Sequence, residues 1–175
     1  VHLLRWYAGA GSARAGRDLA NALIALGHRR VGLVSVQTRD EWSAWREDGL
    51  MRGFADAGLD DAVRVVRVDT AAVDRALESE GTLARCVELG HQLESRMETL
   101  GPSWYTRDKR GAGSVMVSLR NRAMATVLQP LLEQLLQQSQ ISAWIGITDT
   151  IALTALDFLR FRGVQVPGQI SVAGF

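Results

Sequence analysis

Asp149 stands between an apolar run and a helical pattern in the segment GITDTIALTAL, residues 146–156. Aspartate is a favoured helix N-cap, because its side chain accepts hydrogen bonds from the exposed N–H groups of the first turn. Parallel sheets also bind ligands just beyond the carboxyl ends of their strands, which is where this carboxylate is expected. Asp149 therefore either only caps a helix or also accepts hydrogen bonds from the hydroxyl or ring N–H groups of a ligand.

Arg46 is a second candidate ligand contact. The pattern places it in the first turn of its helix, where the helix dipole disfavours a cation. It shares a face with Leu50 and Phe54, so it points toward the sheet, where an arginine costs stability unless a partner satisfies it. Asp40 or Asp48 would be a structural partner, and a bound ligand is slightly favoured over either.

Tryptophans add a third kind of candidate, because aromatic rings bind the apolar faces of sugars and the planes of bases. Trp42, Trp45 and Trp104 lie in or beside predicted loops on the strand-end side. Each of them taken alone is better explained by a core or interface position. Trp144 lies inside a predicted strand and is expected in the core.

The remaining motifs do not indicate an enzyme. The glycine-rich segment GAGSARAG lacks the spacing of a dinucleotide-binding loop. His2, His28 and His91 are scattered without metal-ligand spacing, and His28 is expected to bond a backbone group. No nucleophile–base pair stands out, so we expect no catalytic residue, no cofactor and no metal.

Composition sets the broad class. The chain has 175 residues, of which 47% are hydrophobic and 22% charged, as in a globular domain with a real core. A formal net charge of +1 gives no strong attraction to nucleic acid or to an anionic membrane. Cys86 is the single cysteine, which excludes an intrachain disulfide and favours a reducing, cytoplasmic location. No run reaches the roughly 18 apolar residues of a membrane helix.

The apolar spacing predicts alternating helices and strands. In chain order these are helix 14–27, strand 31–36, helix 43–58, strand 62–68, helix 114–138, strand 141–148, helix 150–162 and strand 169–175. Glycines at 27, 58 and 163 are expected to end three of the helices, and Pro130 to kink or split the fourth. Asp40 or Ser43 is expected to cap helix 43–58. The alternation predicts a three-layer αβα fold around a parallel sheet.

Residues 69–113 break this rhythm. They hold helical patterns, including Val73, Ala76 and Leu77, followed by the loop GPSWYTRDKRGAG. An inserted helical pair, a lid over a site or a subunit contact would each fit this segment.

Three passages resemble the lactose-repressor/galactose-repressor (LacI/GalR) family of bacterial transcription regulators. They are ALIALGHRRVGLVS, WREDGLMRGFADAGL and SAWIGITDTIALTALDFLRFRGVQVPGQISVAGF, in the order that the family has them. The resemblance implies a periplasmic-binding-protein-like (type I) effector domain, in which two lobes clasp a small molecule and a dimer changes its DNA affinity. In the family, the Arg of the R-x-x-G helix and the Asp of an N-D pair contact the effector; here these are Arg46 and Asp149.

The resemblance also implies a division of the chain. Residues 1–30 would hold a helix of the first lobe, residues 31–175 mainly the second lobe, and 69–113 an insertion. Both ends are expected to be cut from a longer protein, and the DNA-binding helix-turn-helix of the family would precede Val1. The chain by itself should therefore not bind an operator, in agreement with its small net charge.

Some positions depart from the family pattern. Gly11 and Ser12 stand where the family often has Asp-Asn, and Thr148 replaces the Asn of the N-D pair. Residues 69–113 are also much longer than the short link of the family, so the insert would reshape the cleft.

The combined hypothesis is an effector-sensing portion of a LacI-family regulator that binds a small polar ligand, foremost a sugar, and acts as a cytoplasmic homodimer. Arg46 and Asp149 would contact the effector, with Asp149 also capping its helix, and Trp42 or Trp104 would lie against its apolar face. The first alternative is a solute-binding protein of a sugar transporter, which a secretory signal upstream would indicate. The second is an enzyme on a similar sheet.

Overall fold

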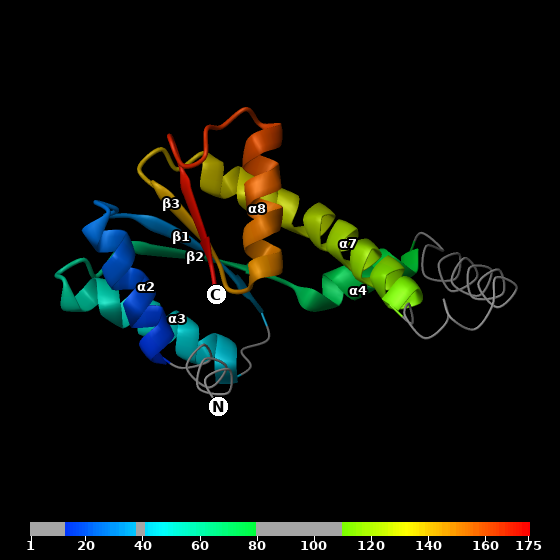
Figure 1. Cartoon of the computed structure of the whole chain (residues 1–175), viewed down its shortest axis with the longest axis horizontal. Helices are drawn as coiled ribbons and strands as arrows, with labels where there is room; N and C mark the ends of the chain where they lie inside the picture. The colour runs from blue at the N-terminus through cyan, green and yellow to red at the C-terminus, as the bar shows by residue number, and fades with distance from the viewer. Residues whose placement is uncertain (1–12, 38–40, 80–109) are drawn as a thin grey trace, which may run out of the picture. The chain divides into compact units, whose positions relative to one another are not determined.

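The structure, a computed structural model, describes residues 13–37, 41–79 and 110–175, and for residues 110–122 the backbone only. It divides into two compact units, Val1–Asp69 with Leu128–Phe175, and Thr70–Val127. The elements, labelled in Figure 1, are α2 (Ala13–Ala25), β1 (Val31–Val36), α3 (Glu41–Asp56), β2 (Val63–Val68), α4 (Thr70–Ser79), α7 (Arg110–Leu136), β3 (Ala143–Gly146), α8 (Asp149–Phe161) and β4 (Ser171–Gly174).

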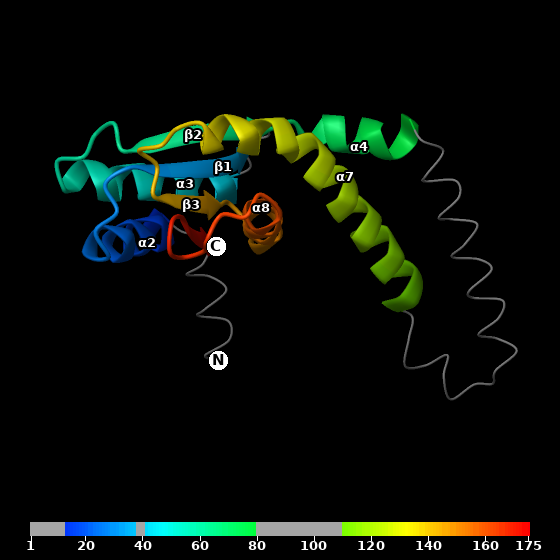
Figure 2. The ribbon, with the colours of Figure 1, turned by 90° about the horizontal axis from the view of Figure 1, so that it is seen from above.

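Four parallel strands form the sheet of the first unit, in the order β2-β1-β3-β4, which Figure 2 shows from above. β1 lies inside the sheet and pairs with β2 and β3, so that Val31 is level with Val63 and with Ala143. All six residues of β1 are buried, as expected of a valine-rich strand covered on both faces. The predicted parallel sheet is therefore confirmed.

Helices cover both faces of this sheet. Ser35, on one face, donates to Glu47 of α3, and α2 packs closely against α3. On the other face, a Cβ at Gly32 would lie 3.1 Å from a methyl of Leu135 in α7, and Trp144 stacks on Phe158 of α8. Figure 1 shows α2 and α3 on one side of the strands and α8 on the other, which confirms the predicted three-layer αβα fold.

Glycines end the helices where the sequence predicts them to end. Gly27 has φ +93°, and the N–H of His28 bonds the carbonyl of Leu23 at 3.0 Å, which closes α2 in a Schellman motif. Gly58 and Gly163, both with φ +73°, end α3 and α8 with the same bonds. These three stops are therefore fixed by local sequence.

Two expectations about the long helix and the inserted segment are met in part. α7 continues through Pro130, so the proline does not split it. In the second unit, Val73 and Leu77 of α4 are buried, as their spacing predicts. Residues 80–109 lie outside the described part, so the predicted insertion at 69–113 and its role stay a prediction.

One expectation about a side-chain partner was wrong, and one of the two expected caps of α3 is excluded. The His28 side chain does not bond a backbone group; its Nδ1 lies 2.9 Å from Oγ of Ser142, which the sheet brings beside it. Ser43 does not cap α3, because the helix begins at Glu41 and Ser43 is buried inside it. The other candidate cap, Asp40, lies outside the described residues.

Small residues let α2 and α3 approach until their backbones touch. A Cβ at Gly16 would overlap the backbone at Leu50, and a Cβ at Gly49 would overlap that of Ala13. Gly53 faces Ala20, which is fully buried. This contact leaves α3 no room to shift toward α2.

We expect Gly49→Ala to lower the free energy of unfolding by about 1–3 kcal/mol, because the added methyl overpacks the contact with Ala13. Alanine is otherwise the better helix former by about 1 kcal/mol, so helix propensity predicts the opposite sign. Urea denaturation measures the change, and Ala55→Gly, at an exposed position of α3, gives the size of the propensity term. A stabilised Gly49→Ala variant would show that the helices are not in backbone contact.

Candidate functional site

The two candidate charged residues meet at the carboxyl edge of the sheet. Arg46, half-buried on α3, donates a hydrogen bond from Nη1 to the carbonyl oxygen of Ile147 at 2.8 Å. Ile147 follows the end of β3, and its own N–H bonds the carbonyl of Val34 in β1 at 2.9 Å. Asp149, two residues further on, is the charged neighbour that acts on the guanidinium of Arg46. The sheet thus joins residues that are far apart in the sequence.

Aromatic rings complete the surroundings of Arg46. Its Cζ lies 5.1 Å from the ring centroid of Trp42 and 5.3 Å from that of Phe175, within cation–π range. Trp42 therefore lies beside Arg46, and its predicted contact with an effector stays a prediction. Phe175 was missed, because only the pairing of β4 with β3 brings the end of this chain to the edge.

Asp149 does not cap α8, contrary to the prediction. Thr148 is the N-cap: its backbone is extended (φ −137°, ψ 159°), and its hydroxyl accepts from the N–H of Ile151 at 3.4 Å. Asp149 is the first helical residue, where a carboxylate is favoured by the helix dipole. Its side chain is exposed and reaches the end of β4, since a Cβ at Gly174 would lie 3.0 Å from Oδ1 of Asp149.

Arg46 is a cation held at a cost. Burial lowers the pKa of Arg46 below its ordinary value, and the nearby Asp149 carboxylate acts in the opposite direction. Burial is the larger effect, although arginine stays protonated in proteins. The predicted position was slightly wrong, because α3 begins at Glu41 and places Arg46 in the second turn, where the dipole penalty is weaker.

The other tryptophans differ in their exposure to solvent. Trp144 is fully buried, as predicted, and its ring centroid lies 6.1 Å from that of Phe158. Trp45 is 47% exposed on α3. The candidate Trp104 lies outside the described residues, and its contact with an effector stays a prediction.

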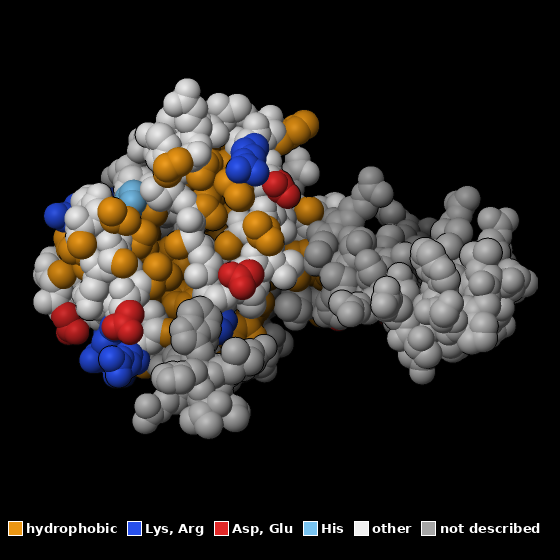
Figure 3. All heavy atoms as spheres, in the orientation of Figure 1, with side chains coloured by type: hydrophobic (Ala, Val, Ile, Leu, Met, Phe, Trp, Pro, Cys, Tyr) orange, Lys and Arg blue, Asp and Glu red, His pale blue; other side chains and the backbone are white. Residues whose placement is uncertain are grey.

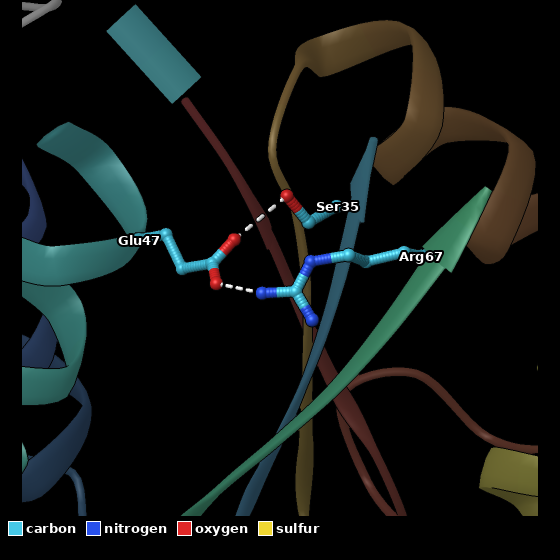
Figure 4. A network of polar contacts seen from close by, with 3 residues as sticks. All are labelled: Ser35, Glu47 and Arg67. Atoms are coloured by element: carbon cyan, nitrogen blue, oxygen red, sulfur yellow. Dashed lines mark hydrogen bonds and ion pairs between the residues drawn. The ribbon is translucent and has the colours of Figure 1, made fainter. Parts of the chain in front are cut away.

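A second polar cluster lies beside the site and was not foreseen. Glu47 is 2% exposed, accepts a hydrogen bond from Ser35 Oγ at 3.0 Å and pairs with Arg67. Figure 4 shows the Glu47 carboxylate reaching from α3 to the serine and arginine on the two strands. The available signal was its spacing, because Glu47 precedes the buried Leu50 and Phe54 by three and seven positions.

Other site types find no support among the described residues. In the ranges that the structure covers, no three His, Cys, Asp or Glu side chains lie together where they could hold a metal ion. None of the helices searched in those ranges is long and apolar enough to cross a membrane. On the face seen in Figure 3, the described Lys and Arg side chains do not join into one continuous patch, in agreement with the small net charge.

We expect Asp149→Asn to destabilise the chain more when Arg46 is present than in an Arg46→Met background. The coupling free energy should be about 0.2–1 kcal/mol, because Asp149 is exposed and its attraction for the arginine is screened. Urea denaturation of the four proteins of the double-mutant cycle measures it, and raising the salt concentration should reduce it. Equal effects of Asp149→Asn in both backgrounds at low salt would show that the two charges do not interact.

Known proteins resemble this chain in sequence and in fold. An HTH-type transcriptional regulator of Mycolicibacterium smegmatis is 26% identical over 166 residues, which are 91% of this chain and 36% of that protein. The chain therefore spans about a third of the length of this curated relative. No family model matches the sequence.

Solved structures share the fold. A LacI-family transcriptional regulator from Silicibacter pomeroyi superimposes with a TM-score of 0.53 at 20% identity, over 93% of this chain and 34% of that one. A sugar-binding LacI-family regulator from Escherichia coli, complexed with phosphate, gives 0.52 at 18% identity, over 93% and 40%. The chain thus has the fold of LacI-family transcriptional regulators and, over most of its length, resembles an HTH-type transcriptional regulator in sequence.

Proposed function

We propose that this chain is the effector-sensing part of a LacI-family transcriptional regulator, and that Arg46 and Asp149 contact the effector. The observation that carries the proposal is the hydrogen bond from Arg46 to the Ile147 carbonyl at the carboxyl edge of a parallel sheet. An arginine kept half-buried there, against the cost of burial, is better explained by a function than by stability. Ligands of open α/β sheets bind at this edge.

The chemistry of the site favours a neutral polar molecule, and we propose a sugar. Arg46 supplies N–H donors and Asp149 supplies acceptors, which together match the mixed hydrogen bonding of hydroxyl groups. The two charges are opposite and leave little net attraction for an anion. Trp42 and Phe175 offer aromatic surface of the kind that packs on sugar rings. A structural relative is itself described as sugar-binding.

The proposed mechanism concerns the whole protein, of which this chain is a part. The effector binds between two lobes and shifts the population of a homodimer between states of different operator affinity. DNA contact belongs to a helix-turn-helix elsewhere in the protein, as the description of the M. smegmatis relative suggests. A cytoplasmic location is part of the proposal, because DNA is the partner. We also propose that residues 1–30 belong to a first lobe and that residues 69–113 are an insertion.

The ligand can be identified by a thermal-shift screen of the full-length protein against sugars, sugar phosphates and nucleobases. A true effector at a hundredfold excess over its dissociation constant should add about 2.7 kcal/mol to the stability of the folded state. Arg46→Ala and Asp149→Ala should each abolish that stabilisation. Arg52→Ala and Asp157→Ala are matched controls, since they remove exposed charges from the same two helices.

Isothermal titration of the ligand that is found then separates the outcomes. Loss of binding in both site variants, with both controls unchanged, supports the proposed contacts. Full affinity in Arg46→Ala or Asp149→Ala would move the effector site away from this edge of the sheet.

A regulator must also couple effector and operator. If the effector changes operator affinity by a factor of about 10, the operator must change effector affinity by the same factor, which is a coupling of about 1.4 kcal/mol. Fluorescence anisotropy with operator DNA, measured with and without effector, tests this in the full-length protein. A ligand that binds at the site and leaves operator affinity unchanged would instead favour a solute-binding role.

A further inference from the structure

Ser35, Glu47 and Arg67 form a cluster next to the candidate site, in which Ser35 and Glu47 are buried and Arg67 is exposed. Glu47 directly follows Arg46 on α3, and the two side chains leave the helix in different directions. Arg46 reaches the end of β3, whereas Glu47 reaches β1 and β2. The same turn of α3 is therefore tied to three strands of the sheet.

The position of the Glu47 carboxylate is set by its partners. Ser35 and Arg67 are level with each other on the paired strands β1 and β2, so their side chains present a hydroxyl and a guanidinium to one point above the sheet. A buried carboxylate is strongly disfavoured without such partners. α3 therefore lies at low energy only where Glu47 meets both of them.

The reach of Arg46 depends on where α3 lies. Its hydrogen bond to Ile147 is 2.8 Å long, and such a bond weakens steeply with a small displacement of the helix. Gly16 and Gly49 bring the backbones of α2 and α3 into contact, which blocks movement of α3 toward α2.

We propose that Glu47 is a positioning residue for Arg46. By pairing with Ser35 and Arg67, it holds the second turn of α3 in the rotation that presents the Arg46 guanidinium to the Ile147 carbonyl and to Asp149. That Glu47 thereby supports effector binding rests on the proposed function. That Glu47 places Arg46 in the free protein does not.

The Ile147 carbonyl is a reporter of this placement that lies on the sheet and not on α3. Ile147–Thr148 is the one Ile–Thr pair in the printed sequence. Labelling isoleucine carbonyls with 13C and threonine nitrogens with 15N therefore reads this carbonyl through the Thr148 amide by NMR. In the full-length protein, Thr148→Ser identifies the signal by removing it, and Arg46→Met gives the carbonyl shift without the hydrogen bond.

Glu47→Gln should move the Ile147 carbonyl shift at least halfway toward its value in Arg46→Met, in ligand-free protein that remains folded. Glu133→Gln is the matched control, because it breaks another Glu–Arg pair of the same unit, that of Glu133 with Arg162, and should leave the shift unchanged. A merely structural role of Glu47 would lower the denaturation midpoint without moving this signal.

The proposal is overturned if the Ile147 carbonyl shift in folded Glu47→Gln equals that of the wild-type protein. It is also overturned if the wild-type protein and Arg46→Met have the same carbonyl shift, because the shift would then not report the hydrogen bond. If Glu47→Gln does not fold, the double variant Glu47→Gln/Arg67→Gln, which leaves no unpaired charge, and Ser35→Ala are read in the same way. Movement of the signal in either supports the proposal, and no movement in both overturns it. The NMR comparison uses protein without ligand, so its result does not depend on the effector screen. If no compound stabilises the protein in the screen, the result for Glu47 still holds.

Discussion

Parallel pairing of β1 with β2 and β3 is the constraint on which the rest of the structure depends. It sends the carboxyl ends of the strands to one edge, so every loop that follows a strand opens on the same side. Arg46 and Asp149 lie at this edge, where charged side chains need not be enclosed in the core. A sheet with antiparallel neighbours would have separated them.

Burying charge at this edge has an energetic cost that the structure offsets in two ways. Arg46 is compensated by a carbonyl, by two aromatic rings and by the field of Asp149, and its lowered pKa shows that burial still dominates. Glu47 is compensated by a hydroxyl and a guanidinium on neighbouring strands. The first arrangement leaves a cation at the carboxyl edge of the sheet, whereas the second pairs the Glu47 carboxylate with a cation on the neighbouring strand.

α3 is the element that links these two arrangements, and its surroundings explain why it can. Glycines let α2 touch its backbone on one side, and Leu50 and Phe54 anchor it on the sheet on the other. The hydrogen bonds of Arg46 and Glu47 add contacts that depend on direction as well as distance.

The sequence by itself determined the type and order of the elements, the parallel sheet and the helix stops, because apolar periodicity and glycine act locally. It also identified Arg46 as a candidate, because a charged side chain is unexpected on the apolar face of a helix. Only the tertiary structure decided that Phe175 reaches Arg46 and that Glu47 meets Arg67. Those choices depend on strand register and on contacts between distant segments, which no local pattern contains.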